Sequence, residues 1–506
     1  MTTKFLDAYL KRIQSSSVYD VAIKTPLQEL HNLSKIFHNR IYIKREDLQP
    51  VFSFKLRGAY NKISALSDAE KQRGIIASSA GNHAQGVAYS AKKLGIKATI
   101  VMPKTTPPIK VKSVRDYGAK AVLVGDAYDD AYAHAQKLIQ RHGYVFIHPY
   151  DDPLVIAGQG TVALEILDQL DNCSAIFVPV GGGGLMAGVI AAVKSLKPEI
   201  KIIGVEPNNS TCLYSALKAG TRVVLDQVGI FADGVAVKQI GEEPFRIVQN
   251  LVDDMVLVNT DEICAAVKEI FEHTRTIAEP SGALSLAGLK KYCTEKNLRN
   301  QNLVCINSGA NINFDRLRHI SERADVGEFK EALYAITIPE QKGSFLKFCK
   351  LIKKRSITEF NYRFSDDKIA HLFVGVGLSN GIEDKHDFET LLQKENYSFI
   401  DLSNNEVATL HVRHMIGGKP KHLQDERVYR FQFPERPGAL MQFLTSIGGK
   451  WNISMFHYRN HGAAFGRVLA GIQIPNSDKE VFELFLKKLA YTYFDETDNI
   501  AYKQFL

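Results

Sequence analysis

The sequence predicts an α/β protein with parallel sheets, followed by two smaller α+β units. Between about residues 40 and 310, short apolar runs alternate with longer helical patterns, which is typical of parallel sheets covered by helices. The chain has 506 residues, too many for one hydrophobic core. Two stretches of its last third also resemble each other. We therefore expect a domain over residues 1–325 and two units over residues 330–420 and 425–506.

The first domain is predicted from strands and helices that follow one another in turn. Each strand is a short apolar run that can be buried on both faces. The helices have apolar residues at helical spacing, as in Asn82–Leu94 and Tyr128–His142. The predicted strands are Ile75–Ser78, Ala98–Met102, Ala121–Val124, Ala175–Val180, Lys201–Val205 and Leu303–Ile306.

A repeat follows the segment ADVGEF at residues 324–329. IPEQKGSFLKF resembles FPERPGALMQF, and their glycines, Gly343 and Gly438, are 95 positions apart. ITEFNYR, from Ile357, resembles ISMFHYR, which begins 96 positions later at Ile453. We expect two copies of one unit of strand, glycine turn, helix and strand. The copies are either structural spacers or ligand-sensing modules.

Composition excludes several classes of protein. The formal charge is +8, but 55 acidic residues are interspersed with 63 basic ones, so no nucleic acid partner is expected. The basic cluster at 350–355 is short and favours a solvated face. No apolar run is long enough to span a membrane, and the N-terminus lacks the apolar core of a signal peptide. The six cysteines are scattered without metal-ligand spacing, so we expect no metal and a reducing, cytoplasmic environment.

The first chemical motif is SFKLRGA, from Ser53 to Ala59. Lys55 follows an extended segment at an expected helix start. A lysine amine is a useful nucleophile when it forms a Schiff base with a carbonyl cofactor. Taken alone, the pattern is more typical of a surface lysine.

The second motif is SSAGNHAQG, from Ser78 to Gly86, which follows a strand and opens a helix. Backbone amides at a helix start bind anions, so the loop can hold a carboxylate, with Ser79 and Asn82 as further donors. The alternative is an ordinary helix N-cap.

The third motif is PVGGGGLMAG, from Pro179 to Gly188. Four consecutive glycines are costly in chain entropy and suit a backbone that closes around a phosphate. The segment lacks the Gly-Lys-Ser/Thr of a nucleotide P-loop, and it is not a dinucleotide fingerprint.

The fourth motif is CINSGAN, from Cys305 to Asn311, at the end of a strand. Ser308 offers a neutral hydroxyl there, or is simply a turn residue. Together the four motifs place an amine, an anion-binding helix start, a phosphate cup and a hydroxyl at the ends of parallel strands, where such folds bind ligands.

With these motifs the chain resembles the fold-type II pyridoxal-phosphate enzymes, whose catalytic domain is similar to the tryptophan synthase β chain. Within them it resembles the biosynthetic threonine dehydratases, over nearly its whole length. The resemblance implies pyridoxal 5'-phosphate as cofactor. Lys55 would be its Schiff-base lysine, and Phe54 would pack on its pyridine ring. Asn82 would bond the phenolic oxygen, and Ser308 would face the pyridine nitrogen.

The resemblance also implies anion-binding residues. The cofactor phosphate would be cradled by Gly181, Gly182, Gly183, Gly184 and Leu185. The substrate carboxylate would be held by Ser79, Gly81 and Asn82.

The implied activity is an ammonia-lyase reaction. L-Threonine would be converted to 2-oxobutanoate and ammonia, the first committed step of isoleucine biosynthesis, with L-serine as a candidate second substrate. Lys55 would remove the Cα proton. Serine racemase is a rival, but the racemases have a serine where this chain has Ala80. Threonine synthase and cysteine synthase lack SFKLRGA, and an amino-acid sensor with a dead catalytic region would not need all four motifs.

The repeated units resemble the ACT-like regulatory modules of the same enzymes. The resemblance implies isoleucine as feedback inhibitor, valine as its antagonist and activator, and a homotetramer. Phe345 would contact the aliphatic side chain of the effector, and Arg355 would pair with its carboxylate. Core packing is equally consistent with Phe345, and a solvated cation is equally consistent with Arg355. Lys353 and Lys354 stand where the family commonly has glycines, so the local loop is expected to differ.

Overall fold

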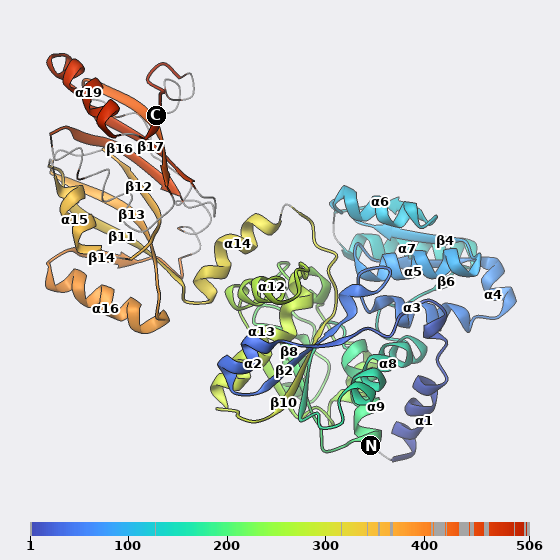
Figure 1. Ribbon diagram of the computed structural model, residues 1–506. Helices are drawn as coiled ribbons and strands as arrows, with labels where there is room; N and C mark the ends of the chain where they lie inside the picture. The colour runs from blue at the N-terminus through green and yellow to red at the C-terminus, as the bar shows by residue number, and fades with distance from the viewer. Residues whose placement is uncertain are drawn as a thin grey trace. The chain divides into compact units, whose positions relative to one another are not determined.

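The computed structural model divides into two compact units, Met1–Ala324 and Asp325–Leu506 (Figure 1). It describes residues 3–126, 128–314, 316–341, 343–352, 355–364, 368–405, 408, 420, 423–434, 445, 450–459, 465–489, 491–499 and 502. Gly438, Lys353 and Lys354 lie outside these residues. Helix α14 (Arg316–Gly327) continues through the segment at which the sequence rhythm changes. The limits at 420 and 425 remain predictions.

The larger sheet of the first unit has six strands in the order β1-β2-β10-β7-β8-β9. All neighbouring strands are parallel except β1, which pairs antiparallel with β2. Its strands alternate between two buried faces: Ile176 packs into one hydrophobic core and Phe177 into another. The strands are β1 (Leu27–Glu29), β2 (Arg40–Arg45), β7 (Ala175–Pro179), β8 (Lys201–Pro207), β9 (Asp254–Val258) and β10 (Asn302–Asn307).

The smaller sheet has four parallel strands in the order β5-β4-β3-β6. Helix α5 (Asn82–Leu94) packs on one face, against Ile75 and Ile100, and α7 (Tyr128–His142) packs on the other, against Ile76 and Val101. Helices α5 and α7 and strands β3 and β4 have the predicted bounds. The remaining predicted strands differ from the observed ones by one or two residues at an end. The strands are β3 (Ile75–Ser78), β4 (Ala98–Met102), β5 (Lys120–Leu123) and β6 (Val145–Phe146).

Helices cover both faces of the sheets, which confirms the predicted parallel α/β class (Figure 1). The other helices of the first unit are α1 (Thr3–Gln14), α2 (His31–Phe37), α3 (Lys55–Ser64), α4 (Asp68–Arg73), α6 (Pro108–Asp116), α8 (Pro153–Gln169), α9 (Gly184–Leu196), α10 (Cys212–Ala219), α11 (Glu242–Val248), α12 (Thr260–Thr274) and α13 (Pro280–Glu295), with short 3-10 turns η1 (Val18–Asp20), η2 (Glu46–Leu48) and η3 (Asp233–Val235).

Close helix contacts position the start of α3. A Cβ added at Gly86 of α5 would come within 3.1 Å of the Lys55 backbone. A Cβ at Gly158 of α8 would come within 2.6 Å of the Arg57 carbonyl oxygen. Glycine at these two positions therefore allows α3 to pack closely between α5 and α8, which fixes the backbone that carries Lys55.

The second unit is a single eight-stranded antiparallel sheet, with strands in the order β14-β11-β13-β12-β16-β17-β15-β18. Its strands are β11 (Glu331–Pro339), β12 (Ile357–Arg363), β13 (Ile369–Gly377), β14 (Ser398–Asp401), β15 (Glu426–Pro434), β16 (Asn452–Arg459), β17 (Phe465–Gln473) and β18 (Thr492–Asp495). The described helices are α15 (Ser344–Ile352), α16 (Gly381–Lys394) and α19 (Lys479–Leu489), with the 3-10 turn η5 (Asn476–Asp478).

The internal repeat is visible in this sheet. Strands β12 and β16, which carry ITEFNYR and ISMFHYR, pair antiparallel so that Asn361 lies opposite His457, its counterpart 96 positions later. A second pair of equivalent contacts joins Thr358 to Glu331 and Ser454 to Glu426. The two copies are thus related by an approximate two-fold axis through the centre of the sheet.

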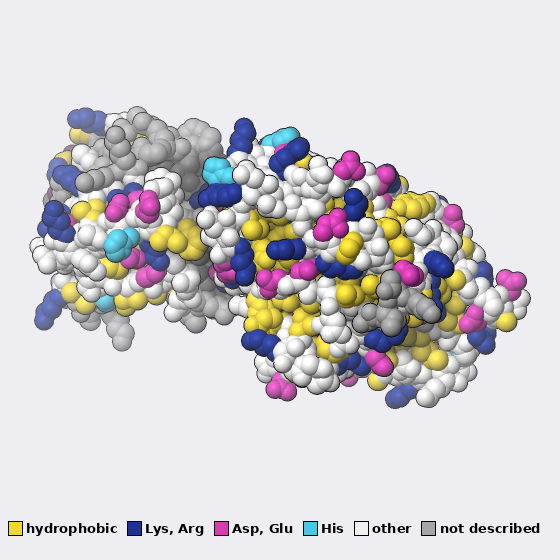
Figure 2. All heavy atoms as spheres, turned by 90° about the horizontal axis from the view of Figure 1, so that it is seen from below, with side chains coloured by type: hydrophobic (Ala, Val, Ile, Leu, Met, Phe, Trp, Pro, Cys, Tyr) yellow, Lys and Arg dark blue, Asp and Glu magenta, His cyan; other side chains and the backbone are white. Residues whose placement is uncertain are grey.

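The distribution of charges, helix hydrophobicity and cysteines in the described residues is that of an ordinary globular protein. On the face drawn in Figure 2, basic and acidic side chains are interspersed. Among the described residues, no helix is both long and apolar enough to cross a membrane. The six cysteines are free and buried. Within the described parts of the chain, no group of three or more His, Cys, Asp or Glu side chains is arranged to hold a metal ion.

Candidate active site

Lys55 is the first residue of α3, and its backbone packs against Gly86 of α5. Its Nζ donates a hydrogen bond to the Pro149 carbonyl oxygen at 3.0 Å and lies 5.3 Å from the centre of the Phe54 ring. No ion pair of Lys55 occurs among the described residues. Burial lowers the pKa of Lys55 to about 8, against the opposing effect of the Glu279 carboxylate. A substantial neutral fraction near neutral pH is what attack on a carbonyl carbon requires.

The loop from Ser78 to Asn82 joins β3 to the start of α5. The Gly81 amide donates to Ser79 Oγ at 3.3 Å, and Ser79 N donates to the Val101 carbonyl at 3.2 Å. The first amides of α5 carry the positive end of the helix dipole. The helix start therefore has the amides that an anion requires, and the binding of a substrate carboxylate by Ser79, Gly81 and Asn82 remains a prediction.

The Asn82 side chain is hydrogen-bonded to Glu279 and Asn311, which lie next to elements of the six-stranded sheet. Its Nδ2 donates to Glu279 Oε1 at 2.5 Å, and its Oδ1 accepts from Asn311 Nδ2 at 2.6 Å. Burial and the Asp233 carboxylate raise the pKa of Glu279 to about 7. The site thus contains a buried carboxylate that the sequence analysis did not single out.

The four glycines connect β7 to α9, and Gly183 has a φ of 89°, which favours glycine. A Cβ at Gly182 would overlap the Tyr150 ring, and one at Gly184 would come within 3.0 Å of the Tyr150 backbone. Leu185 is buried in the first turn of α9. Because Tyr150 follows Pro149, this loop and Lys55 share one neighbouring segment.

Ser308 follows β10 and is 4% exposed. Its Oγ donates to the Ser281 carbonyl at 3.2 Å, and its own carbonyl accepts from Phe54 N at 3.2 Å. Ser53 and Gly309 form an isolated β-bridge beside this contact. The structure therefore brings the SFK and SGAN motifs together through their backbones.

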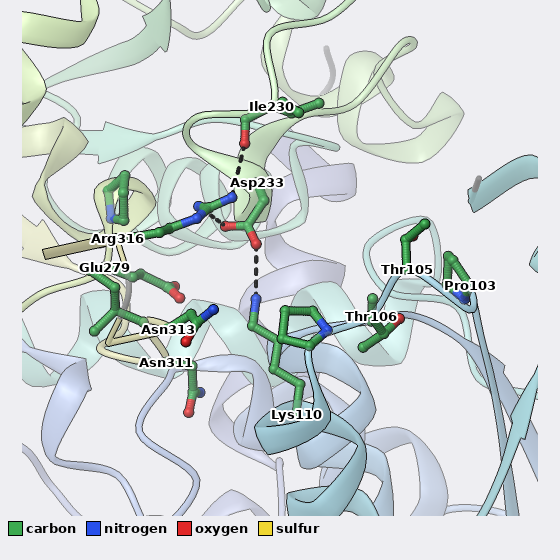
Figure 3. Close-up of a pocket in the computed structure, with 14 residues that line it drawn as sticks. Pro103, Thr105, Thr106, Lys110, Ile230, Asp233, Glu279, Asn311, Asn313 and Arg316 are labelled. Carbon is green, nitrogen blue, oxygen red and sulfur yellow. Dashed lines mark hydrogen bonds and ion pairs between the residues drawn. The ribbon is translucent and has the colours of Figure 1, made fainter. Parts of the chain in front are cut away.

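A cavity of about 330 Å³ lies beside Glu279 and Asn311, the two partners of Asn82 (Figure 3). The predicted site residues themselves, Lys55, Ser79, Asn82, Ser308 and the four glycines among them, do not line it. Ala80, Glu279 and Asn311 contribute to its wall. In its lining, Asp233 accepts from Lys110 at 2.8 Å and from Arg316 at 3.4 Å. The cavity is large enough for a small amino acid and has both signs of charge in its lining.

The residues present fit a pyridoxal-phosphate group. Ser53 Oγ, Ser281 Oγ and His83 Nδ1 are buried polar atoms with no hydrogen-bond partner among the described residues. Burial, with a smaller contribution from Lys55, lowers the pKa of His83 to about 3, so this imidazole is neutral. An amine without an ion-pair partner among the described residues, two helix starts and unpaired polar atoms together suit a polar anionic cofactor.

Several residues near the site were missed by the sequence analysis. Glu279 precedes Pro280 at the start of α13, and only its place as an N-cap could have indicated it. Asn311 is the last residue of CINSGAN, but the motif gave it no role. Pro149 and Tyr150 follow the very short strand β6, which carries no clear sequence signal.

The two regulatory candidates lie in the second unit. The Phe345 ring packs against Tyr362 at 4.8 Å and Phe360 at 5.3 Å. The Arg355 guanidinium pairs with Asp384 at 2.6 Å. The carboxylate that Arg355 contacts in this structure is therefore the protein's own, and roles for both residues in binding an effector remain predictions.

Comparisons with known proteins agree with the geometry. The family described as pyridoxal-phosphate dependent enzyme matches residues 18–309. The C-terminal regulatory domain of threonine dehydratase matches twice, at residues 322–412 and 417–506. The L-threonine dehydratase biosynthetic IlvA of Pasteurella multocida is 56% identical over 98% of this chain and 97% of its own length.

Solved structures give the same fold for the first unit. The processed form of threonine deaminase isoform 2 from Solanum lycopersicum has a TM-score of 0.64 and 48% identity, over 64% of this chain and 90% of that one. Maize serine racemase has a TM-score of 0.59 and 31% identity, over 62% of this chain and 95% of that one.

The fold and the site define a pyridoxal-phosphate dependent enzyme. Because the similarity to IlvA extends over nearly the whole length of both chains, regulatory repeat included, the chain belongs to the biosynthetic threonine dehydratases.

Proposed function

We propose that this enzyme converts L-threonine to 2-oxobutanoate and ammonia, with L-serine as a second substrate. The observation that carries the proposal is the set of contacts around Lys55. Its Nζ donates to the carbonyl oxygen of Pro149, the residue before the Tyr150 that packs on the glycine loop, and the neighbouring Phe54 N donates to the Ser308 carbonyl oxygen. The near full-length similarity to a biosynthetic threonine dehydratase supports the choice of substrate.

Each residue group would have one task. Lys55 would bind the cofactor covalently, and its amine, once displaced by the substrate, would accept the proton from the substrate Cα. Glycines 181–184 and Leu185 would hold the phosphate at the start of α9, where backbone amides and the helix dipole favour an anion. Ser79, Gly81 and Asn82 would hold the substrate carboxylate at the start of α5.

Pyridoxal phosphate, when bound, supplies the electron sink for this elimination. Phe54 would pack on its ring. Ser308 would face the ring nitrogen with a hydroxyl, which cannot stabilise a protonated nitrogen as a carboxylate would. That arrangement favours elimination over transamination.

Ala80 argues for elimination rather than racemisation. It lines the cavity beside Asn311 and Glu279, and its methyl group cannot donate a proton. A serine at this position would place a hydroxyl in the same wall. The overall similarity to maize serine racemase therefore supports the fold and not racemase activity.

The proposal extends to regulation and assembly. The duplicated regulatory domain supports binding of an amino-acid effector, and we propose isoleucine as inhibitor and valine as its antagonist. We also propose that the chain forms a homotetramer, as the resemblance to the biosynthetic threonine dehydratases implies. Six free, buried cysteines are in keeping with a reducing cytoplasmic location.

The test is a 2-oxo acid assay on threonine and serine, with and without isoleucine and valine. The expected result is 2-oxobutanoate from threonine, lowered by isoleucine and restored by valine. A purified chain that shows no visible absorbance with pyridoxal phosphate and produces no 2-oxo acid would be an amino-acid sensor instead. D-Serine formed from L-serine by the wild-type chain would contradict the role of Ala80.

A further inference from the structure

The oxygen and the nitrogen of the Asn82 amide are both hydrogen-bonded to residues from the half of the unit that contains the six-stranded sheet. Asn82 begins α5, which packs on the four-stranded sheet. Glu279 is the N-cap residue of α13 and Asn311 follows β10, and both belong to the six-stranded half. The hydrogen bonds at 2.5 Å and 2.6 Å therefore join the two halves directly at the candidate cofactor site.

The contacts also determine which way each amide faces. Asn311 Nδ2 lies 2.8 Å from the Val51 carbonyl oxygen, which can only accept, so this end of the Asn311 amide is the nitrogen. The Asn82 atom that faces the same nitrogen must then be its oxygen. Its nitrogen consequently faces Glu279, and a carboxylate is a suitable acceptor for it.

One hydrogen on the Asn82 nitrogen remains available. Glu279 takes one of its two N–H groups, and the other has no partner among the described residues. Without Glu279, the Asn82 nitrogen would lose its acceptor, and only the contact from Asn311 would oppose a half-turn of the amide that replaces this donor by an oxygen. The oxygen would repel a phenolate-type oxygen that the N–H would bind.

The residues around Glu279 leave space for its side chain. It is 3% exposed, and its backbone N donates to the Gly309 carbonyl at 3.1 Å. A Cβ at Gly309 would come within 2.7 Å of Glu279 Oε1. Glycine in the SGAN motif thus leaves room for the carboxylate that reaches Asn82.

We propose that Glu279 is a positioning residue for the cofactor: with Asn311 it fixes the Asn82 amide so that the free N–H points to the ring oxygen of pyridoxal phosphate. The inference rests on the proposed function, and it assigns to Glu279 no contact with the reacting atoms. Its effect on cofactor binding passes entirely through Asn82.

The charged groups that face Glu279 come from several elements. Burial and then Asp233 of η3 raise the pKa of its carboxyl. Lys110 of α6, the hydrogen bond from Asn82 and Arg316 of α14 lower it, and the outcome is a pKa of about 7. Lys55 of α3 also interacts with it. Above pH 7 the ionised carboxylate accepts a charge-assisted hydrogen bond from Asn82, and below pH 7 the protonated group is a weaker acceptor.

A double-mutant cycle on the full chain tests the inference. The dissociation constant of pyridoxal phosphate is measured by its visible absorbance for the wild type, E279A, N82A and the double variant. Loss of the hydrogen bond to a charged group should weaken binding by roughly 10- to 100-fold in E279A. In the N82A background the same change should have almost no further effect.

A conservative variant separates positioning from folding. E279Q keeps the volume and can still accept from Asn82, so it should bind the cofactor better than E279A does. The ratio of the E279Q dissociation constant to that of the wild type should decrease as the pH is lowered from 8 to 6. The wild-type carboxyl becomes protonated over this range and then accepts the hydrogen bond no better than the glutamine does. E269Q is the matched control, because Glu269 pairs with Lys290 on α13, and the same substitution there should leave cofactor binding unchanged.

The outcomes distinguish the two claims. A wild-type chain without a visible band would overturn the proposed function. A wild-type band together with equal, additive losses in E279A and N82A would overturn only the positioning role. A ratio of the E279Q and wild-type dissociation constants that does not change with pH would also overturn the positioning role.

Discussion

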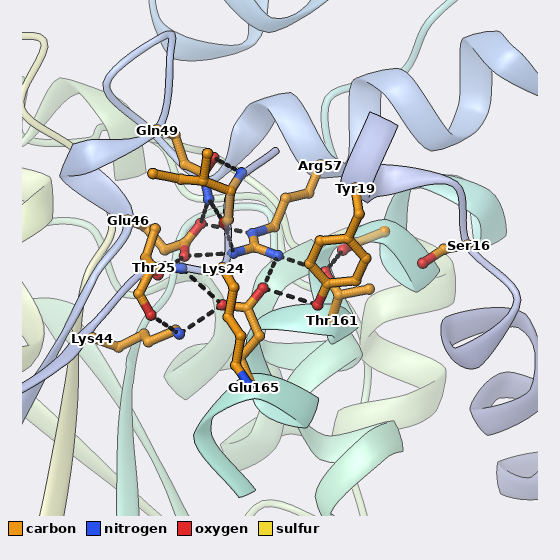
Figure 4. A network of polar contacts seen from close by, with 12 residues as sticks. Ser16, Tyr19, Lys24, Thr25, Lys44, Glu46, Gln49, Arg57, Thr161 and Glu165 are labelled. Carbon is orange, nitrogen blue, oxygen red and sulfur yellow. Dashed lines mark hydrogen bonds and ion pairs between the residues drawn. The ribbon is translucent and has the colours of Figure 1, made fainter. Parts of the chain in front are cut away.

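Replacement of Arg57 by methionine should destabilise the first unit strongly. Arg57 lies two residues after Lys55 on α3, and its side chain is fully buried (Figure 4). Its Nε is 2.8 Å from Glu46 Oε2 and its Nη1 is 2.6 Å from Glu165 Oε1. Lys44 also contacts Glu165 at 2.6 Å, so the carboxylate that loses its ion-pair partner is Glu46, which then feels only the more distant charge of Lys44.

The magnitude follows from the burial of both partners. Removal of one member of a buried ion pair typically costs about 3–5 kcal/mol, because the other charge stays buried without compensation. Burial alone would raise the pKa of Glu46, and Arg57 keeps it below its usual value. Without Arg57, Glu46 can take up a proton at pH 5, so the loss of stability should be larger at pH 8 than at pH 5.

The assay is urea unfolding followed by far-ultraviolet circular dichroism. The only tryptophan of the chain is Trp451, which reports on the second unit through its fluorescence and should show an unchanged transition. R40M is the matched control, because the Arg40–Glu29 pair is exposed and should contribute little. A loss below about 1 kcal/mol for R57M would refute the reasoning.

Three further results are expected. S308D should reduce threonine elimination and increase side reactions, because a carboxylate would stabilise a protonated pyridine nitrogen; an unchanged rate and product distribution would show that Ser308 is not near the ring. The rate of cofactor attachment to the apo-protein should increase from pH 7 to 9 with a midpoint near 8, as Lys55 loses its proton, and a rate still increasing steeply at pH 10 would contradict the lowered pKa. A chain ending near Asp325 should retain the cofactor but lose inhibition by isoleucine, a coupling typically worth about 1–3 kcal/mol; retained inhibition would place the effector at the catalytic site.

Much of the first unit could be predicted because its strands are buried on both faces. Such strands are short apolar runs, and β3 and β4 have the predicted bounds. The edge strand β6 has two residues and a partly exposed pattern, so no apolar run marks it. The sheet orders could not be predicted either, since β2 and β10 are neighbours in the sheet but far apart in sequence.

The four motifs could be predicted because each has an unusual local composition. Glu279 and Arg57 could not, since one acidic or basic residue in a helical segment is typical of a solvated surface. Their importance depends on long-range partners: Glu279 meets Asn82, and Arg57 meets Glu165. The repeat was visible in sequence, but the pairing of its copies through β12 and β16 required the structure.

The most direct test of the proposed function is the K55A variant of the full chain. The wild type should show a visible absorbance band with pyridoxal phosphate and should produce 2-oxobutanoate from threonine. In K55A the band of the covalently bound cofactor and the 2-oxobutanoate should both be lost, because Lys55 is the proposed anchor and proton acceptor. The far-ultraviolet circular dichroism spectrum should remain that of the wild type. Appreciable 2-oxobutanoate production by folded K55A would contradict the assignment of the site.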